Sequence, residues 1–332
     1  MSPSRESADP PHWADIGEST AVAGIWFFYG IHRLLGRLPL RVCLCPVILY
    51  YWATQGIARR ASIEYLQQMQ LAHGVIGAIG EAPGWRHSVR HFMSFAETIL
   101  DKILATSGRY QFQGLRFVGR ERMEEMVAKG QGGILLTGHI GCLELCQALA
   151  SRAPGLKLNV LVHTRHAQRF NRVLQRLNPH SPVCLLQVTD VDAATAVMLG
   201  EKVARGEFVA IAGDRVPVRQ SKTAKAMFLG REASFPVGAY VLAAIFKCPL
   251  LMIGCLRERD GHVMTFECLA ERVELPRKGR QERLDQLVAQ FAQGMERLLV
   301  RAPYEWFNFY PFWAQPVAAQ SGAAHLSEAS PL

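Results

Sequence analysis

Short apolar runs alternate with segments of helical spacing along most of this chain of 332 residues. The runs end in glycine or polar residues and have the length of buried strands, whereas the segments between them repeat apolar residues every three or four positions. Strands that alternate with helices predict an α/β fold, with a mostly parallel central sheet flanked by helices. The expected strands are residues 115–118, 133–137, 158–163, 183–188, 208–212, 250–256 and 262–267. The expected helices are residues 120–129, 141–152, 168–177, 193–205, 237–246 and 283–300.

Two uncharged runs rich in aromatic residues precede this region, at residues 21–31 and 42–58. Arginines lie between them, and neither run reaches the ~20 residues of a comfortable membrane span. Apolar helices with tryptophan and tyrosine beside arginines suit a membrane surface, with the cations on lipid phosphates. Two core helices of a soluble protein are the alternative. Residues 61–106 predict two more helices, broken near residues 80–84.

The chain is therefore expected to have four parts. Polar composition predicts disorder at both ends. The parts are a disordered N-terminus at 1–19, an N-terminal helical membrane-associating extension at 20–106, an α/β domain at 107–313 and a disordered tail at 314–332.

Composition narrows the classes of function. The net charge of +9 indicates acidic partners, which could be anionic lipid headgroups, acyl carrier protein or nucleic acid, but the basic residues are too dispersed for a nucleic-acid stripe. Eight cysteines show no Cys-x-x-Cys and no zinc-like spacing, which favours a reducing, cytoplasm-facing compartment and no metal site. The sequence lacks Gly-x-Ser-x-Gly, the nucleotide-binding glycine motifs and His-Glu-x-x-His.

The strand at 133–137 leads into a six-residue motif, His-Ile-Gly-Cys-Leu-Glu, at residues 139–144. Five steps along a regular helix turn a side chain by about 500°, roughly 140° away from the starting face. His139 and Glu144 can therefore meet only if His139 precedes the helix and Glu144 lies in its first turn. A carboxylate there is favoured by the helix dipole, and it can hold one imidazole nitrogen while the other faces a substrate. This is the base and the orienting group of a catalytic triad.

Other interpretations of the motif remain open at this stage. A turn histidine, followed by a glutamate that only complements the helix dipole, has the same spacing. Cys142 is a candidate nucleophile, although its place at the helix start is typical of a packing residue. The free backbone N–H groups near Gly141 are candidates to stabilise an oxyanion.

A strand, then His-x4-Asp/Glu, then a helix resembles the first block of the lysophospholipid acyltransferase superfamily. The rest of the chain is most similar to the bacterial lipid A late acyltransferase branch, in order and spacing, from roughly residue 20 to 313. The matching blocks are Val-His-Thr-Arg at 162–165, Ile-Ala-Gly-Asp-Arg at 211–215, Phe-Leu-Gly-Arg at 228–231, Phe-Pro-Val-Gly at 235–238 and Trp-Phe-Asn-Phe-Tyr-Pro-Phe-Trp at 306–313.

The resemblance implies an acyltransferase at the cytoplasmic face of the bacterial inner membrane. It implies transfer of a fatty acyl group from acyl carrier protein or coenzyme A to a hydroxyl of a lipid or glycolipid, with no metal, bound cofactor or nucleic acid. His139 and Glu144 become the catalytic pair, and Gly141 lets the substrate approach the backbone. A thioesterase that uses water as acceptor and a non-catalytic lipid-binding protein on the same fold are the alternatives.

The resemblance also suggests substrate-binding residues. Arg165 ends an expected strand and is a candidate to bind a lipid phosphate or the phosphate of the carrier arm. Asp214 and Arg215 follow another strand, and they either pair to shape the pocket or leave Arg215 to hold the acceptor. Residues 230–238 are expected to form a loop into an apolar helix, with Pro236 at its first position.

Overall fold

A computed structural model describes residues 22–78, 80–110, 114–150, 155–162, 184–187, 192–216 and 222–314. The helix predicted at 168–177, the polar N-terminus and the tail after residue 314 lie outside these residues.

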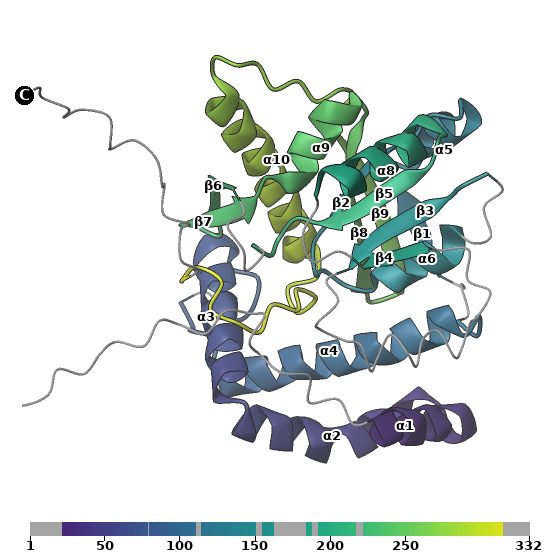
Figure 1. The fold of residues 1–332 in the computed structure, drawn as a ribbon. Coiled ribbons are helices and arrows are strands. Elements are labelled where there is room, and N and C mark those ends of the chain that lie inside the picture. Colours follow the sequence, from purple (N-terminus) through teal and green to yellow (C-terminus); the bar gives the residue numbers. More distant parts are fainter. Residues whose placement is uncertain are drawn as a thin grey trace, which may run out of the picture.

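A seven-stranded sheet in the order β1-β9-β8-β2-β5-β3-β4 forms the centre of the described part (Figure 1). The strands β8, β2, β5, β3 and β4 run parallel, whereas β9 is antiparallel to β8 and β1 follows the direction of β9. The predicted mostly parallel sheet is thus confirmed. Only two residues join β8 to β9, and such a short connection permits only antiparallel neighbours. The strands are β1 (Arg116–Val118), β2 (Gly133–Thr137), β3 (Leu158–Val162), β4 (Cys184–Gln187), β5 (Phe208–Ala212), β8 (Leu250–Glu258) and β9 (Gly261–Ala270).

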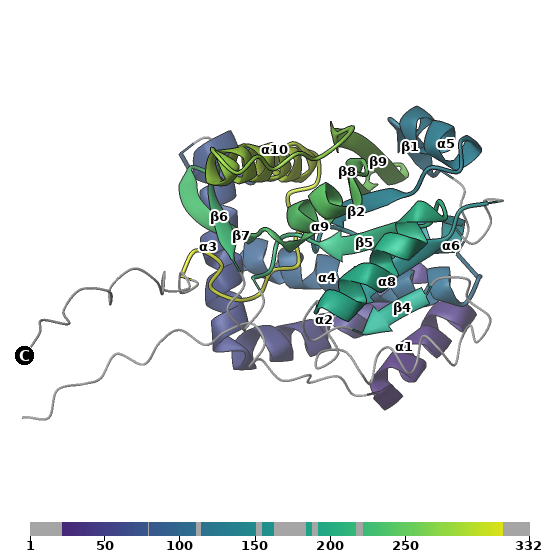
Figure 2. The same cartoon turned by 45° about the horizontal axis from the view of Figure 1, so that its top comes forward.

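Helices cover both faces of this sheet (Figure 2). All five residues of β2 are buried, as expected of a central parallel strand. Ile134 and Leu136 belong to the core that β2 shares with α8, α9 and α10, whereas Leu135 packs with Met123 and Met126 of α5 on the other face. The helices of this part of the chain are α5 (Glu121–Ala128), α6 (Leu143–Ala150), α8 (Ala193–Ala204), α9 (Gly238–Phe246) and α10 (Arg280–Arg301).

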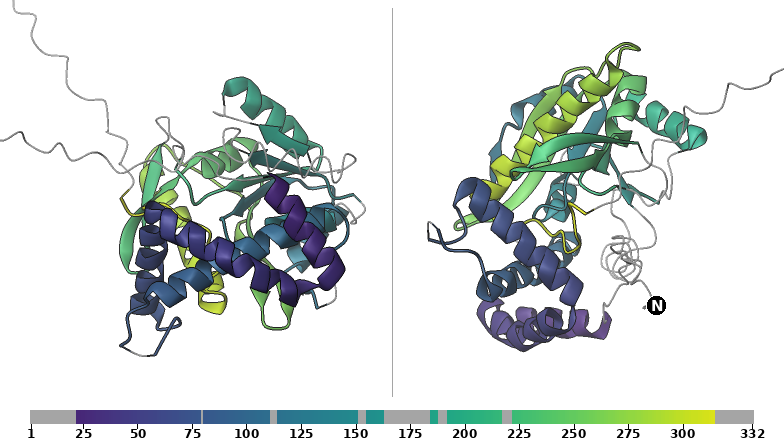
Figure 3. Two further views of the ribbon diagram at one scale, coloured as in Figure 1. Left: turned by 90° about the horizontal axis from the view of Figure 1, so that it is seen from below. Right: turned by 90° about the vertical axis from the view of Figure 1, so that its left-hand side faces the viewer.

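Four helices precede the sheet: α1, α2 and α4 lie below it in Figure 1 and α3 stands to its left, and the view from below in Figure 3 shows α1 and α2 on the outside. Leu40, Leu44 and Ile48 form one face of α2, which packs on Phe92 and Leu100 of α4. The two helices predicted within 61–106 are confirmed as most of α3 and as α4. In the part of the chain that is described, no helix combines the length and the apolar character of a membrane span. The helices are α1 (Val22–Leu35), α2 (Arg37–Thr54), α3 (Gly56–His73) and α4 (Trp85–Thr106).

A two-stranded hairpin replaces the loop predicted at residues 230–238. β6 (Thr223–Phe228) and β7 (Arg231–Pro236) pair antiparallel and pack on α10. Leu229 and Gly230 both have positive φ angles, as two-residue hairpin turns require. Pro236 is therefore the last residue of a strand, and the prediction that it begins a helix is wrong.

Candidate active site

His139 and Asp214 meet at the carboxyl edge of the sheet, each two residues beyond the end of a strand. Their strands β2 and β5 are parallel neighbours with Thr137 opposite Ala212, so the two chains leave the sheet side by side. The Nδ1 atom of His139 lies 2.7 Å from Oδ1 of Asp214, and the backbone N–H of His139 donates to Oδ2 at 2.8 Å. The register of the sheet thus builds a histidine–carboxylate pair.

Trp306 supplies a third donor to the same carboxylate. Its indole N–H donates to Oδ2 of Asp214 at 3.0 Å, and both side chains are fully buried. A carboxylate that accepts several hydrogen bonds in a buried place is held in one orientation and in its charged form.

The electrostatics of the pair favour a neutral imidazole beside a charged carboxylate. Burial by itself would raise the pKa of Asp214, but His139 and Arg215 hold that pKa well below its usual range. Burial and then the Arg215 cation lower the pKa of His139, against the opposing effect of Asp214. At neutral pH the Nδ1–H group therefore donates to Asp214, and Nε2 keeps the lone pair that a general base uses. The His139 side chain is 35% exposed, which leaves the imidazole open on one side.

Glu144 contacts a different residue from the one predicted. It lies in the first turn of α6, as expected, but its Oε1 is 3.1 Å from Nζ of Lys102 on α4. No hydrogen bond or ion pair between the described side chains of His139 and Glu144 is formed. The physical reason is that the ammonium group of Lys102 attracts the Glu144 carboxylate, while the Nδ1–H group of His139 donates its hydrogen bond to Asp214.

The turn after His139 requires glycine at position 141. Gly141 has a φ of +62°, and a Cβ there would overlap the carbonyl oxygen of Cys255. Its N–H donates to the Glu305 carbonyl at 2.8 Å, and the N–H of Cys142 donates to the Cys255 carbonyl at 3.0 Å. The helix itself begins at Leu143. These two N–H groups are therefore occupied, so they are not among the free donors expected near Gly141.

Cys142 is a packing residue. It is fully buried in a small core with Leu145 and Cys146. Burial, and then the charge of Glu144, raise the pKa of the Cys142 thiol well above its usual range. The group is a protonated thiol at neutral pH, which argues against a cysteine nucleophile. All eight cysteines of the chain are free.

Two arginines were predicted to bind substrate, and the structure describes one of them. Arg215 donates from Nη2 to the Phe307 carbonyl at 3.1 Å and lies over the Tyr310 ring, with 5.7 Å from Cζ to the ring centroid. Its charge lowers the pKa of both members of the His139 pair. Arg165 lies outside the described residues.

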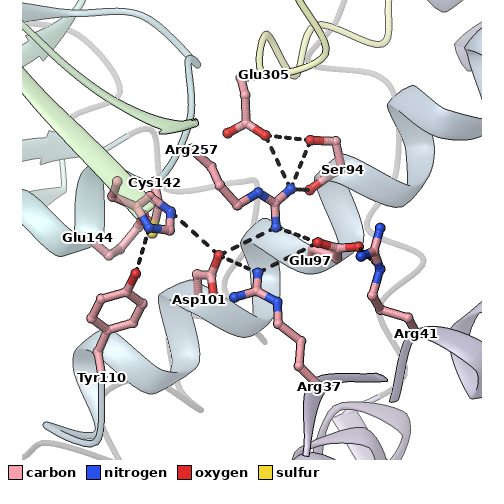
Figure 4. A network of polar contacts seen from close by, with 11 residues as sticks. Arg37, Arg41, Ser94, Glu97, Asp101, Tyr110, Cys142, Glu144, Arg257 and Glu305 are labelled. Carbon is pink, nitrogen blue, oxygen red and sulfur yellow. Dashed lines mark hydrogen bonds and ion pairs between the residues drawn. The ribbon is translucent and has the colours of Figure 1, made fainter. Parts of the chain in front are cut away.

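A buried charge network beside the motif turn was not anticipated from the sequence (Figure 4). Arg257 of β8 lies at its centre, 2.5 Å from Glu97 and 3.2 Å from Glu305. Ser94 donates to the same oxygen of Glu305 at 2.5 Å. Because the Glu305 carbonyl receives the N–H of Gly141, this network holds the strand-like segment that supports the motif.

The network also joins α2 to α4. Arg37 lies 3.0 Å from Asp101, and Arg41 lies 2.7 Å from Glu97. Arginines of this segment were expected on lipid phosphates, but these two face carboxylates of α4. These ion pairs hold α2 against α4, because Glu97 and Asp101 are buried and need cationic partners.

Comparison with known families gives the class of protein. A family model for bacterial lipid A biosynthesis acyltransferases matches residues 89–315, more than half of the chain. The chain belongs to this family, and it is accordingly an acyltransferase with a lipid-like acceptor and an acyl thioester donor. The matched range contains His139, Glu144, Asp214 and Trp306, whereas α1, α2 and α3 precede it. A comparison with curated proteins gave no match.

Proposed function

We propose that this protein transfers a fatty acyl group from acyl carrier protein or coenzyme A to a hydroxyl of a lipid or glycolipid, at the cytoplasmic face of the bacterial inner membrane. The observation that carries the proposal is the pair formed by the partly exposed His139 and the buried Asp214 at the carboxyl edge of the sheet, in a chain that belongs to an acyltransferase family. Open α/β sheets bind their ligands at this edge.

The chemistry needs a base, and His139 is placed to be one. Nε2 takes the proton of the acceptor hydroxyl while its oxygen attacks the thioester carbonyl, and the charge of Asp214 stabilises the imidazolium that forms. The tetrahedral intermediate collapses with cleavage of the C–S bond. The departing thiolate takes the proton back from His139, so that the enzyme returns to its starting state. No covalent acyl-enzyme is required.

Two cations lie near this base. The charges of Arg215 and Lys102 both lower the pKa of His139. The phosphate of a carrier arm, of coenzyme A or of a lipid headgroup matches their charge. In this proposal Glu144 acts through Lys102, by holding its ammonium group at the site.

The outer face of α1 and α2 supports a location on the membrane. Leu34 is 82% exposed, and further along Leu38, Val42 and Leu49 line the face of α2 opposite its buried side. A helix with apolar residues on both faces is unusual in water, and a continuous exposed apolar surface indicates an interaction site. A lipid surface fits the aromatic and arginine content of this segment.

The activity is tested with purified full-length protein, labelled acyl thioesters of carrier protein and coenzyme A, and an extract of membrane lipids. Labelled lipid supports transfer, labelled free fatty acid alone supports a thioesterase, and an intact donor supports a non-catalytic protein. His139→Ala is expected to lose about 10²–10⁴-fold in rate, which is what a positioned base contributes. His73→Ala, which removes a histidine paired with Glu296 on the surface, is the matched control. Activity of His139→Ala within threefold of the control would refute the assignment.

The location is tested separately by flotation with vesicles that contain phosphatidylglycerol. Changing Leu38, Val42 and Leu49 together to aspartate should abolish vesicle binding, because it places three charges on the proposed contact face. Changing Val197 and Ile245 to aspartate is the control, since both are equally exposed but lie on α8 and α9. Vesicle binding that persists in the triple variant would show that this face of α2 does not contact the membrane.

A further inference from the structure

Trp306 contacts the candidate active site through both its side chain and its backbone. The indole N–H donates to Asp214, and the backbone forms an antiparallel bridge with Ile140 inside the motif turn. The N–H of Phe307, the next residue, donates to the His139 carbonyl at 2.8 Å. Among the donors that the described residues supply to the Asp214 carboxylate, the indole is the one that does not belong to His139.

The backbone of Trp306 is itself held by a chain of hydrogen bonds that begins on α2. The indole N–H of Trp52 donates to Ser88 at 3.0 Å, Ser88 donates to Ser62 at 2.9 Å, and Ser62 donates to Nδ1 of His91 at 3.0 Å. With Nδ1 as acceptor, Nε2 of His91 carries the hydrogen and donates to the Trp306 carbonyl at 2.8 Å. Burial lowers the pKa of His91 to about 4, so this neutral form persists at physiological pH.

We propose that Trp306 is a positioning residue for acyl transfer: its indole N–H fixes the Asp214 carboxylate against His139, and His91 holds the Trp306 backbone in place for this role. The inference rests on the proposed function. The Asp214 side chain has two rotatable bonds, and both of its other donors belong to one residue, His139. A third donor from a different, fully buried side chain removes this freedom.

The proposal has a consequence for the pH dependence of the reaction. The indole N–H stabilises negative charge on Asp214, and it competes with His139 for that charge. Without the indole donor, the carboxylate stabilises the imidazolium more strongly and the pKa of His139 rises. The acid limb of the rate profile should then move to higher pH, while the maximal rate falls because the carboxylate is less well oriented. A residue that only fills space would not move the acid limb in this direction.

The sharpest test replaces the indole N–H and keeps the ring. Trp306→benzothienylalanine, introduced into the full chain by nonsense suppression, exchanges the N–H for sulfur at nearly constant shape. The matched control is the same replacement of Trp313, an indole in the same aromatic cluster, 6.4 Å from Trp306 between ring centroids, whose Nε1 has no hydrogen-bond partner in the described part of the chain. Both proteins are assayed with lauroyl and palmitoyl thioesters and the lipid extract.

We expect kcat of the Trp306 variant to fall about tenfold with unchanged KM, which is the scale of one hydrogen bond to a charged group. Its acid limb should shift upward, and the Trp313 variant should match the wild type. Equal losses in both variants would overturn the proposal, because the effect would then belong to the packing of the aromatic cluster. An unchanged kcat in the Trp306 variant would overturn it as well. If the wild type itself shows no transfer, the proposed function fails first.

A second variant covers the case in which the replaced protein does not fold. Ser62→Ala removes the donor to Nδ1 of His91 without touching Asp214 or the aromatic cluster, and it frees His91 to adopt the tautomer that no longer donates to Trp306. We expect kcat to fall about threefold, with the acid limb shifted in the same direction. Wild-type kcat and acid limb in Ser62→Ala would contradict the part assigned to His91.

Discussion

Replacing Asp214 by asparagine is the change that most directly tests the His139–Asp214 pair. Asparagine keeps the shape of the side chain but removes its charge, and its amide group can face His139 with the wrong atom. In the reaction, the imidazolium of His139 forms 2.7 Å from this carboxylate. Two unit charges about 4 Å apart at an effective dielectric constant of about 20 attract by about 4 kcal/mol, which corresponds to a factor of about 10³ in rate.

The assay is single-turnover acyl transfer by Asp214→Asn beside Glu144→Gln, with thermal melting of both variants. Asp214→Asn should lose about 10³-fold in rate. Glu144→Gln should lose about tenfold or less, because its carboxylate holds Lys102 and does not contact His139. A Glu144→Gln variant that loses as much as Asp214→Asn, with an unchanged melting curve, would return the motif glutamate to the role predicted from the sequence. Near wild-type turnover of Asp214→Asn would refute the pair itself.

Three further outcomes are expected. The rate should fall on the acid side with a midpoint below about 6.5, since the base must be neutral and the pKa of His139 is lowered; a pH profile of kcat/KM with a higher midpoint would contradict this. Gly141→Ala should lower the unfolding free energy by at least about 2 kcal/mol in urea melts, because its φ is positive and its Cβ would overlap the Cys255 carbonyl; an unchanged midpoint would argue against the turn. His91 has a pKa near 6.5 in the unfolded chain but about 4 in the folded protein, so the free energy of unfolding should fall by about 3 kcal/mol as the pH is lowered from 6.5 to 4. His91→Gln should show a smaller decline in urea melts over this pH range, and an equal decline in this variant would disprove the assignment.

The strand and the turn around His139 were predictable because their signals are local. The run at 133–137 is apolar, is bounded by glycines and has the length of a buried strand, and the structure gives β2 the same bounds. The mostly parallel sheet followed from the alternation of strands and helices. Local patterns of this kind depend on residues a few positions apart, which is the range over which periodicity is informative.

The partner of His139 was not predictable in this way. Asp214 lies 75 positions further along the chain, and only the adjacency of β2 and β5 brings it close. Strand order depends on the packing of the whole domain. One signal was present: both residues lie two positions beyond an expected strand, at 137 and 212. With parallel neighbours in register, equal offsets predict contact. The resemblance paired His139 with the motif glutamate, whereas in the structure the Glu144 carboxylate contacts Lys102.

The hairpin β6–β7 was missed for a different reason. Its inward positions include the small residues Ala224, Ala226 and Ala233, which give a weak alternation of apolar and polar character. Its turn contains Leu229 at positive φ, where sequence rules expect glycine, asparagine or aspartate. The Leu229 N–H donates to Glu296 of α10 at 2.7 Å, a tertiary contact that helps to hold this unusual turn.

The position of Trp306 so late in the chain has a consequence for how the enzyme is made. Chains leave the ribosome from the N-terminus, so α1 and α2 are free to fold long before the segment that carries Trp306 emerges. His139 and Asp214 can pair once β5 has joined β2, yet the Asp214 carboxylate and the Gly141 turn still lack their last supports. A nascent chain, or one truncated before residue 306, therefore contains His139 without the indole donor to its partner Asp214. Catalytic competence is expected to arrive late in synthesis, after the part proposed to reach the lipid surface is already in place.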